Sequence, residues 1–150
     1  MNEIIKNILS TIRYATISTV DDNGKAWAAP VWYVFDETNM LLCWWSPINS
    51  QHSQNIERND EVYITIFNST TPEGEGLGLY IRANAKKVPD DKLDKVIDLY
   101  NSTTTQFKLN RENTTNNAPT RLYQADPITI QINDGIETDG FYQDIRRDVA

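Results

Sequence analysis

The stretch from Ala29 to Asn59, APVWYVFDETNMLLCWWSPINSQHSQNIERN, carries most of the information about the fold. Its first half holds two apolar, aromatic-rich runs on either side of the polar residues 36–39, a pattern typical of two hairpin-linked strands. Its second half is polar and has helical character, with Ser50 placed to cap the helix. The stretch therefore predicts a β-hairpin whose second strand leads into a polar turn and the N-terminus of a helix.

The same patterns extend outward to both ends of the chain. Alternation and β-branched content predict about seven strands, at residues 14–20, 25–35, 40–45, 61–67, 79–88, 121–132 and 136–146. Helical spacing predicts helices at residues 3–12, at 50–59 and from Pro89 onward. The last two strands are expected to turn at Asn133-Asp134-Gly135. A chain of 150 residues with this content predicts one domain, residues 1–150, built as an antiparallel barrel or sandwich.

The predicted strand at 25–35 is apolar on both of its faces. Trp27 and Val31 point to one side, and Ala28 and Trp32 point to the other. A strand that is apolar on both sides is covered on both sides. In a chain this small, we expect the second cover to come from a partner subunit.

Composition excludes several classes of function. The chain has 14 basic and 21 acidic residues and a formal charge of -7, which argues against sequence-independent binding of nucleic acid. The single cysteine, Cys43, rules out an intramolecular disulfide and is expected to be an inert, buried residue. One histidine and one cysteine give little basis for a metal site. The sequence shows no signal peptide and no apolar run long enough for a membrane span, so we expect a cytoplasmic protein.

The start of the predicted helix near Ser50 has the chemistry of an anion site. Unpaired backbone N–H groups and the Ser50 hydroxyl would bind a phosphate, and His52 lies in the first turn, where a phosphate favours the protonated imidazole. Aromatic residues on the preceding strands, among them Trp32 and Trp45, suit a planar ligand. A phosphate at the helix and a ring along the strands is a sensible arrangement for FMN.

Simpler interpretations of these residues remain open. Ser50 can be a helix cap and nothing more, and a single exposed histidine is unremarkable. Aromatic residues more often belong to a core or an interface than to a ligand site, so we expect two of the four tryptophans to be mainly structural. The Thr- and Asn-rich residues 101–120 are expected to be the most weakly ordered part of the chain.

The order of these motifs resembles one known family. The pattern A-x-P-V-W-Y over residues 28–33, followed by Ser46 and then by S-x-H-x-x-N over residues 50–55, is similar to the pyridoxamine 5'-phosphate oxidase-like, FMN-binding split-barrel proteins. The resemblance extends from about Tyr14 to Asp148. It implies an all-β fold with minor helices: a six- to seven-stranded antiparallel split β-barrel with Greek-key order, which forms a homodimer and holds FMN between its subunits.

The resemblance also implies positions for the flavin. Residues 30–33 would face the ring, residues 44–46 would lie beside the ribityl chain and phosphate, and residues 50–52 would form the phosphate turn, with Asn55 one helical turn further on. Strand position suggests that Arg121 and Gln131 contribute from the second subunit. The expected cofactor-binding residues are Pro30, Val31, Trp32, Tyr33, Trp44, Trp45, Ser46, Ser50, Gln51, His52, Asn55, Arg121 and Gln131.

Two departures from the vitamin-salvage oxidase bear on function. That enzyme usually has lysine where this chain has His52 and arginine where it has Pro30, so two permanent positive charges are missing and phosphate affinity should be lower and dependent on pH. The C-terminal Arg146 and Arg147 do not match the spacing of the oxidase's substrate-binding arginines. No side chain is identified as catalytic.

We therefore expect an FMN-dependent oxidoreductase that acts on an unidentified small molecule, with the redox chemistry supplied by the flavin. The alternative is a flavin-binding or stress-related carrier or sensor without turnover. A third hypothesis is a different planar cofactor, such as haem or a deazaflavin.

Overall fold

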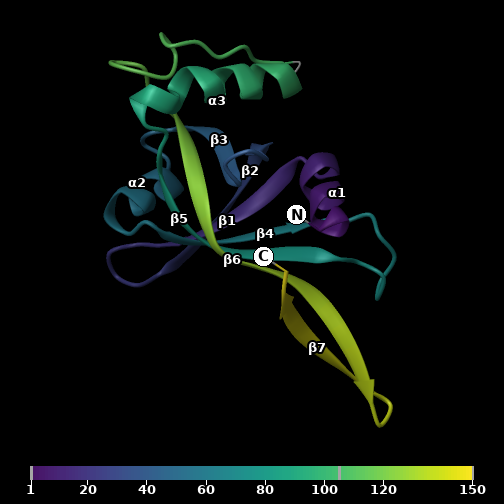
Figure 1. Cartoon of the computed structure of the whole chain (residues 1–150). Helices are drawn as coiled ribbons and strands as arrows, with labels where there is room; N and C mark the ends of the chain where they lie inside the picture. Colours follow the sequence, from purple (N-terminus) through teal and green to yellow (C-terminus); the bar gives the residue numbers. More distant parts are fainter. Residues whose placement is uncertain (1, 105, 150) are drawn as a thin grey trace.

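The computed structural model describes residues 2–104 and 106–149, with the side chains of 134–138 left out of the description. Three helices lie at the ends and on the outside of a sheet: α1 (Glu3–Thr11), α2 (Gln51–Arg58) and α3 (Asp90–Thr103) (Figure 1). The strands are β1 (Tyr14–Val20), β2 (Ala26–Asp36), β3 (Leu41–Pro47), β4 (Glu61–Phe67), β5 (Gly78–Lys87), β6 (Thr120–Thr138) and β7 (Phe141–Asp148).

The strands form one antiparallel sheet that closes on itself. Their order is β3-β2-β1-β4-β5-β6-β7, and an additional pairing of β3 with β6 closes the first six into a barrel. The order β3-β2-β1-β4 is that of a Greek key. The predicted all-β, antiparallel split barrel is therefore confirmed, with β7 as one extra strand outside the closed barrel.

Two hydrophobic clusters hold the barrel together. The larger one fills the interior, and α1 closes one end of it with Ile5, Ile8 and Leu9. The smaller one lies on the outside, where α3 packs over β2, β3 and β6. The Tyr33 hydroxyl ties α1 to the barrel because it donates a hydrogen bond to the Leu9 carbonyl at 3.3 Å.

The doubly apolar strand β2 has two different halves. In its C-terminal half, α3 of the same chain supplies the second cover, so that Val34 is only 3% exposed. In its N-terminal half Ala28 and Pro30 are exposed, and Trp27 is 49% exposed. A partner subunit is thus not needed to cover residues 33–36 of β2. For residues 26–30, the cover by a partner subunit that the sequence suggests stays a prediction.

The turn between the last two strands is misplaced in the sequence prediction. The chain contains two Asp-Gly steps, and β6 continues past the first to Thr138, turning at Asp139-Gly140 instead. Asp139 has φ 54° and Gly140 has φ 76°, the left-handed conformation that a tight hairpin turn requires. As a result β6 and β7 form a long two-stranded arm that projects from the barrel (Figure 1).

The segment after α3 is held by specific side-chain hydrogen bonds and ion pairs in its described residues, 104 and 106–119. The Asn101 side chain accepts from the Leu109 N–H and donates to the Leu109 carbonyl, both at 2.8 Å. Arg111 returns to α3, where its guanidinium binds Asp90 at 2.7 Å and Asp94 at 2.8 Å. These polar and charged side chains thus bond the backbone of the segment and dock it on α3, while its weak order stays a prediction.

The turn between β2 and β3 depends on a buried carboxylate. Asp36, 5% exposed, accepts from the N–H groups of Thr38 and Asn39 and from the Asn39 amide, and it pairs with Lys95 of α3 at 3.2 Å. Burial alone would raise the pKa of Asp36, but the hydrogen bonds from Asn39 and Lys95 outweigh it and lower the pKa. This carboxylate joins the hairpin to α3.

Asp36→Ala should therefore lower the free energy of unfolding by about 2 kcal/mol, since it removes a buried carboxylate that accepts three hydrogen bonds and pairs with Lys95. Urea unfolding followed by tryptophan fluorescence measures the change. Asp22→Ala, which breaks an exposed ion pair with Arg58, is the control and should cost less than about 1 kcal/mol. Equal effects of the two substitutions would contradict the structural role of Asp36.

Candidate functional site

The barrel opens between β2 and β3. Their ladder runs from Asp36–Leu41 to Tyr33–Trp44 and then ends. Beyond this pair β2 continues to Ala26 along β1, while β3 continues to Pro47 along β6. The two strands therefore separate at Tyr33–Trp44, and the edge of β2 over residues 26–32 faces a split instead of β3.

The start of α2 lies at the end of β3, beside this split. Ser50 caps the helix and accepts from the Ser53 N–H at 3.3 Å. The His52 Nε2 atom lies 2.9 Å from the Ser46 hydroxyl and 3.3 Å from the Ser50 hydroxyl. His52 thus contacts both Ser46 and Ser50, two other residues predicted to bind phosphate, at a helix N-terminus, where N–H groups and the helix dipole favour an anion.

The protonation state of His52 is set by its surroundings. Burial lowers the pKa of His52, so the imidazole of the protein without a ligand is neutral near pH 7. A bound phosphate would oppose this effect because its negative charge favours the imidazolium. Anion binding at this site is therefore expected to take up a proton.

Asn55 and Gln51 have a supporting position behind these groups. Asn55 is fully buried; it accepts from the Gln51 side chain at 2.8 Å and donates to the Thr19 hydroxyl at 2.9 Å. These bonds fix α2 against β1. Thr19 was missed by the sequence prediction, because a threonine in a strand gives no local sign that it will contact a helix 36 residues later.

The predicted ring-facing residues divide between the two faces of β2 and β3. Val31, Tyr33 and Trp44 are 6%, 2% and 0% exposed, and the Trp44 ring stacks on Tyr123 at 6.0 Å. These three side chains belong to the core and not to the surface of the site, because alternate residues of a strand point to opposite faces. The prediction that these three residues lie at the ring therefore depends on their backbone, which borders the split.

The remaining aromatic residues lie on the outer face, near α3. Trp32 meets the Tyr100 ring edge-on at 5.1 Å, and Trp45 packs against Phe107 at 5.9 Å. Trp32 and Trp45 are the first residues of β2 and β3 beyond the end of their ladder. They therefore flank the point where the split begins, with Pro30 exposed further along β2.

The two residues assigned to a second subunit have separate positions. Arg121 lies opposite Ser46 in the β3–β6 ladder, but its guanidinium donates to the carbonyls of Asn116, Ala118 and Thr120. Gln131 lies ten residues further along β6, about 30 Å away at the rise of a strand, and donates to Asp148 at 2.8 Å. Within one chain, Gln131 is not part of the cluster at α2.

Residues 2–104 and 106–149, the described part of the chain, also bear on other classes of site. Within them, no three His, Cys, Asp or Glu side chains are grouped as metal ligands would be. No helix there is both long and apolar enough to cross a membrane. Cys43 is fully buried, and burial raises its pKa to about 12, so its thiol is unreactive.

The family model described as pyridoxamine 5'-phosphate oxidase matches residues 1–133. The chain belongs to this family. The match includes Ser46, Ser50 and His52 at the start of α2 and the split between β2 and β3, and it ends within the β6–β7 arm. No curated protein matches the sequence at a significant level.

Solved structures with the same fold are distant in sequence. HutZ, the haem storage protein of Vibrio cholerae, is 17% identical with a TM-score of 0.66, over 84% of this chain and 89% of that chain. An FAD-binding protein of Mesorhizobium loti is 11% identical with a TM-score of 0.64, over 88% and 94%. A candidate 5-nitroimidazole antibiotic resistance protein of Bacteroides thetaiotaomicron is 13% identical with a TM-score of 0.70, over 88% and 82%. At these identities the likeness shows the fold alone.

The lowered pKa of His52 predicts a pH-dependent stability of the ligand-free protein. Below about pH 6.5 the unfolded chain binds a proton at His52 that the folded chain does not, so the free energy of unfolding should fall as pH decreases through this value. Chemical denaturation across this pH range measures the free energy of unfolding of the wild type and of His52→Gln. The carboxylates contribute equally to both proteins, so the difference between the two pH dependences reports His52. If the two proteins lose stability in parallel, His52 does not have the lowered pKa.

Proposed function

We propose that this protein binds FMN, with the phosphate at the N-terminus of α2 and the ring in the split between β2 and β3. The contact of His52 Nε2 with the Ser46 and Ser50 hydroxyls carries the proposal. Each of these groups can donate a hydrogen bond to a phosphate oxygen once His52 is protonated, and the helix supplies unpaired N–H groups beside them. The site thus fits a single phosphate group although the chain has a formal charge of -7.

The split suits the ring for a different reason. Over residues 26–32 the edge of β2 that faces away from β1 has no ladder to β3, so its backbone groups are available to a heterocycle with several hydrogen-bonding atoms. Trp32 and Pro30 line the outer side of this edge. When bound, a flavin supplies hydride and electron transfer, while the protein binds, orients and shields it.

Haem is the competing cofactor, since the fold is shared with a haem storage protein. A protein ligand to haem iron is most often histidine or cysteinate. His52 Nε2 contacts two serine hydroxyls, and the Cys43 thiol is fully buried in a strand. These two residues are the chain's complete supply of His and Cys, so the donor set favours flavin over haem.

A second copy of the chain fits this proposal. The N-terminal half of β2, which borders the split, leaves Trp27 49% exposed together with Ala28 and Pro30. An exposed apolar strand beside a ligand site is expected to be covered. We propose a homodimer in which the second subunit covers this half of β2 and encloses the flavin.

Two functional classes are consistent with such a site. One is an oxidoreductase that acts on a small molecule stacked on the flavin. The other is a carrier or sensor that binds flavin without turnover, and it is favoured because, in the described part of the chain, the groups that share a hydrogen bond with His52 are serine hydroxyls and not a lysine or arginine. Reduction of the bound flavin by NADH or NADPH under anaerobic conditions supports the enzyme, and flavin that neither reductant reduces supports the carrier.

The phosphate site predicts a preference for FMN over riboflavin. Wild-type protein should bind FMN about tenfold or more tightly than riboflavin, because charge-assisted hydrogen bonds to phosphate add affinity. His52→Ala should reduce this preference and leave riboflavin affinity unchanged, and Ser10→Ala, at an exposed position of α1, serves as the control. Flavin fluorescence quenching measures both affinities.

The preference should also increase as pH falls toward the ordinary pKa of histidine, since the bound phosphate requires a protonated His52. Equal affinities for FMN and riboflavin would contradict the phosphate site. No binding of either would contradict the proposed function as a whole.

A further inference from the structure

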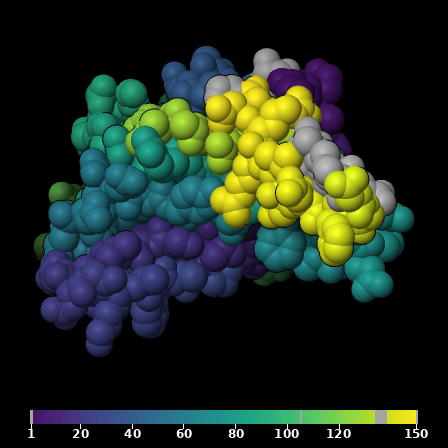
Figure 2. Space-filling view, turned by 90° about the horizontal axis from the view of Figure 1, so that it is seen from below, coloured from purple at the N-terminus to yellow at the C-terminus, as the bar shows by residue number. Residues whose placement is uncertain are grey.

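A groove lies between the arm and the loop that joins β4 to β5, residues 68–77. Its volume is about 680 Å³, within the range of small-molecule sites, and its walls come from the end of β4, the loop, β5 and the arm. Figure 1 shows the loop and the arm at the same end of the barrel, and in Figure 2 the arm forms a ridge beside the teal residues of this end. This is the end of β4 farther from α2, so the groove is separate from the candidate phosphate site.

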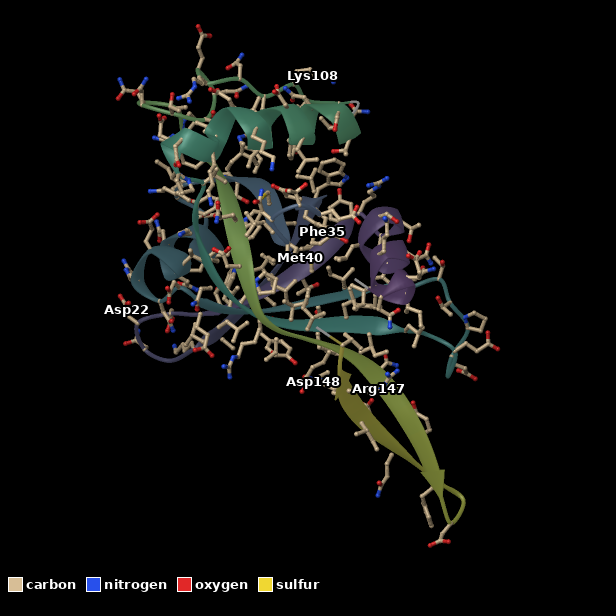
Figure 3. The ribbon with its side chains drawn as sticks, in the orientation of Figure 1. Asp22, Phe35, Met40, Lys108, Arg147 and Asp148 are labelled. Atoms are coloured by element: carbon tan, nitrogen blue, oxygen red, sulfur yellow. The ribbon has the colours of Figure 1, made fainter. Side chains whose placement is uncertain are left out.

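Contacts between distant parts of the chain hold the two walls of the groove together. The Asn133 side chain accepts from the Gly78 N–H at 2.6 Å and donates to the Gly76 carbonyl at 2.9 Å, which ties the end of the loop to β6. Gln131 donates to Asp148 at 2.8 Å, where β7 returns to the barrel (Figure 3). The loop and the arm are therefore fixed next to each other.

Three aromatic side chains line the groove, those of Phe67, Tyr80 and Tyr142. Phe67 lies opposite Gly78 in the β4–β5 ladder. Because Gly78 has no side chain, the Tyr80 ring leans over it and comes within 3.4 Å of the place where a Cβ would be. Phe67 and Tyr142 are 58% and 66% exposed. Apolar groups that gather around a hollow of the surface are typical of a binding site.

The face of the arm that meets the groove is identified by Arg146. Its guanidinium lies 3.9 Å from the centre of the Tyr80 ring and donates to the Tyr63 hydroxyl. Side chains two residues apart in a strand share a face, so Tyr142 and Asp144 lie on the same face of β7 as Arg146. Arg146 does not itself line the groove, but its contact with Tyr80 shows that a cation is stable against this aromatic wall.

The groove is acidic. Glu73 and Asp144 line it, and no lysine or arginine does so among the residues that the structure describes. Within that part of the chain, neither carboxylate has an ion pair or a side-chain hydrogen bond. In the sequence, residues 68–77 and 133–145 together contain six acidic residues and no basic residue, compared with a formal charge of -7 for the whole chain. This end of the barrel therefore attracts a positively charged ligand.

We propose that the groove binds a small organic cation, a substituted ammonium ion. Its apolar groups would lie against the rings of Phe67 and Tyr142, and Glu73 and Asp144 would balance its charge. The face of an aromatic ring attracts a cation, and it favours one that also carries apolar surface. An inorganic cation fits less well because it would make no use of the rings. Nor are three His, Cys, Asp or Glu side chains grouped as metal ligands in the described ranges.

Benzyltrimethylammonium is a suitable probe, and benzyl alcohol is its neutral comparator with the same ring. Each is titrated into isotope-labelled protein without FMN, and backbone amide NMR reports where it binds. The cation should shift the amides of residues 67–69 and 142–144 and should bind about tenfold more tightly than the alcohol. Equal affinities for the two probes, shifts confined to other residues, or no shift at millimolar concentration would each overturn the proposal.

Two substitutions at exposed positions separate the charge from the ring. Asp144→Asn removes a carboxylate, Tyr142→Leu replaces the ring by an apolar side chain, and each should weaken binding of benzyltrimethylammonium about threefold. The matched controls are Glu112→Gln and Tyr14→Leu, which make similar changes at exposed positions outside the groove and should leave the affinity unchanged. Unchanged affinity of either groove variant, or an equal loss in its control, also contradicts the proposed site.

Discussion

The pairing of Tyr33 with Trp44 is the constraint on which the candidate site depends. It is the last pair of the β2–β3 ladder, and both side chains are buried in the core, where Trp44 stacks on Tyr123 and Tyr33 binds the Leu9 carbonyl. Beyond it, β3 follows β6 and β2 follows β1. The position of this buried pair thus determines where the barrel opens and where the edge of β2 becomes available. It also determines where β3 leads into the start of α2.

Much of this fold could be predicted from local patterns. The bounds of β1 and β4 match the prediction because each strand alternates between a buried and a more exposed face, a pattern with one interpretation. The β6–β7 turn could not be placed in this way. Asp134-Gly135 and Asp139-Gly140 are equivalent as turn sequences, and the choice depends on how far β6 continues beyond its pairing with β5.

The candidate site, too, was predictable from the sequence only where its features are local. Ser50 and His52 were predictable because a helix cap and its first turn are local features, and the structure brings His52 into contact with Ser50 and Ser46. The burial of Tyr33 and Trp44 in the core could not be predicted, since a strand that is apolar on both faces does not reveal which face meets the interior. Nor could sequence indicate that Asn55 would bind Thr19, because their contact exists only once α2 has docked on β1.

The most direct test of the FMN site is a backbone amide NMR titration of isotope-labelled protein. With FMN, the amides of Gln51 and His52 and those of β2 along the split should shift together, and inorganic phosphate should shift only the α2 amides. These are the groups that the structure leaves available to an anion and to a ring. Shifts confined to another part of the barrel, or α2 amides unchanged by both ligands, would contradict a phosphate site at His52.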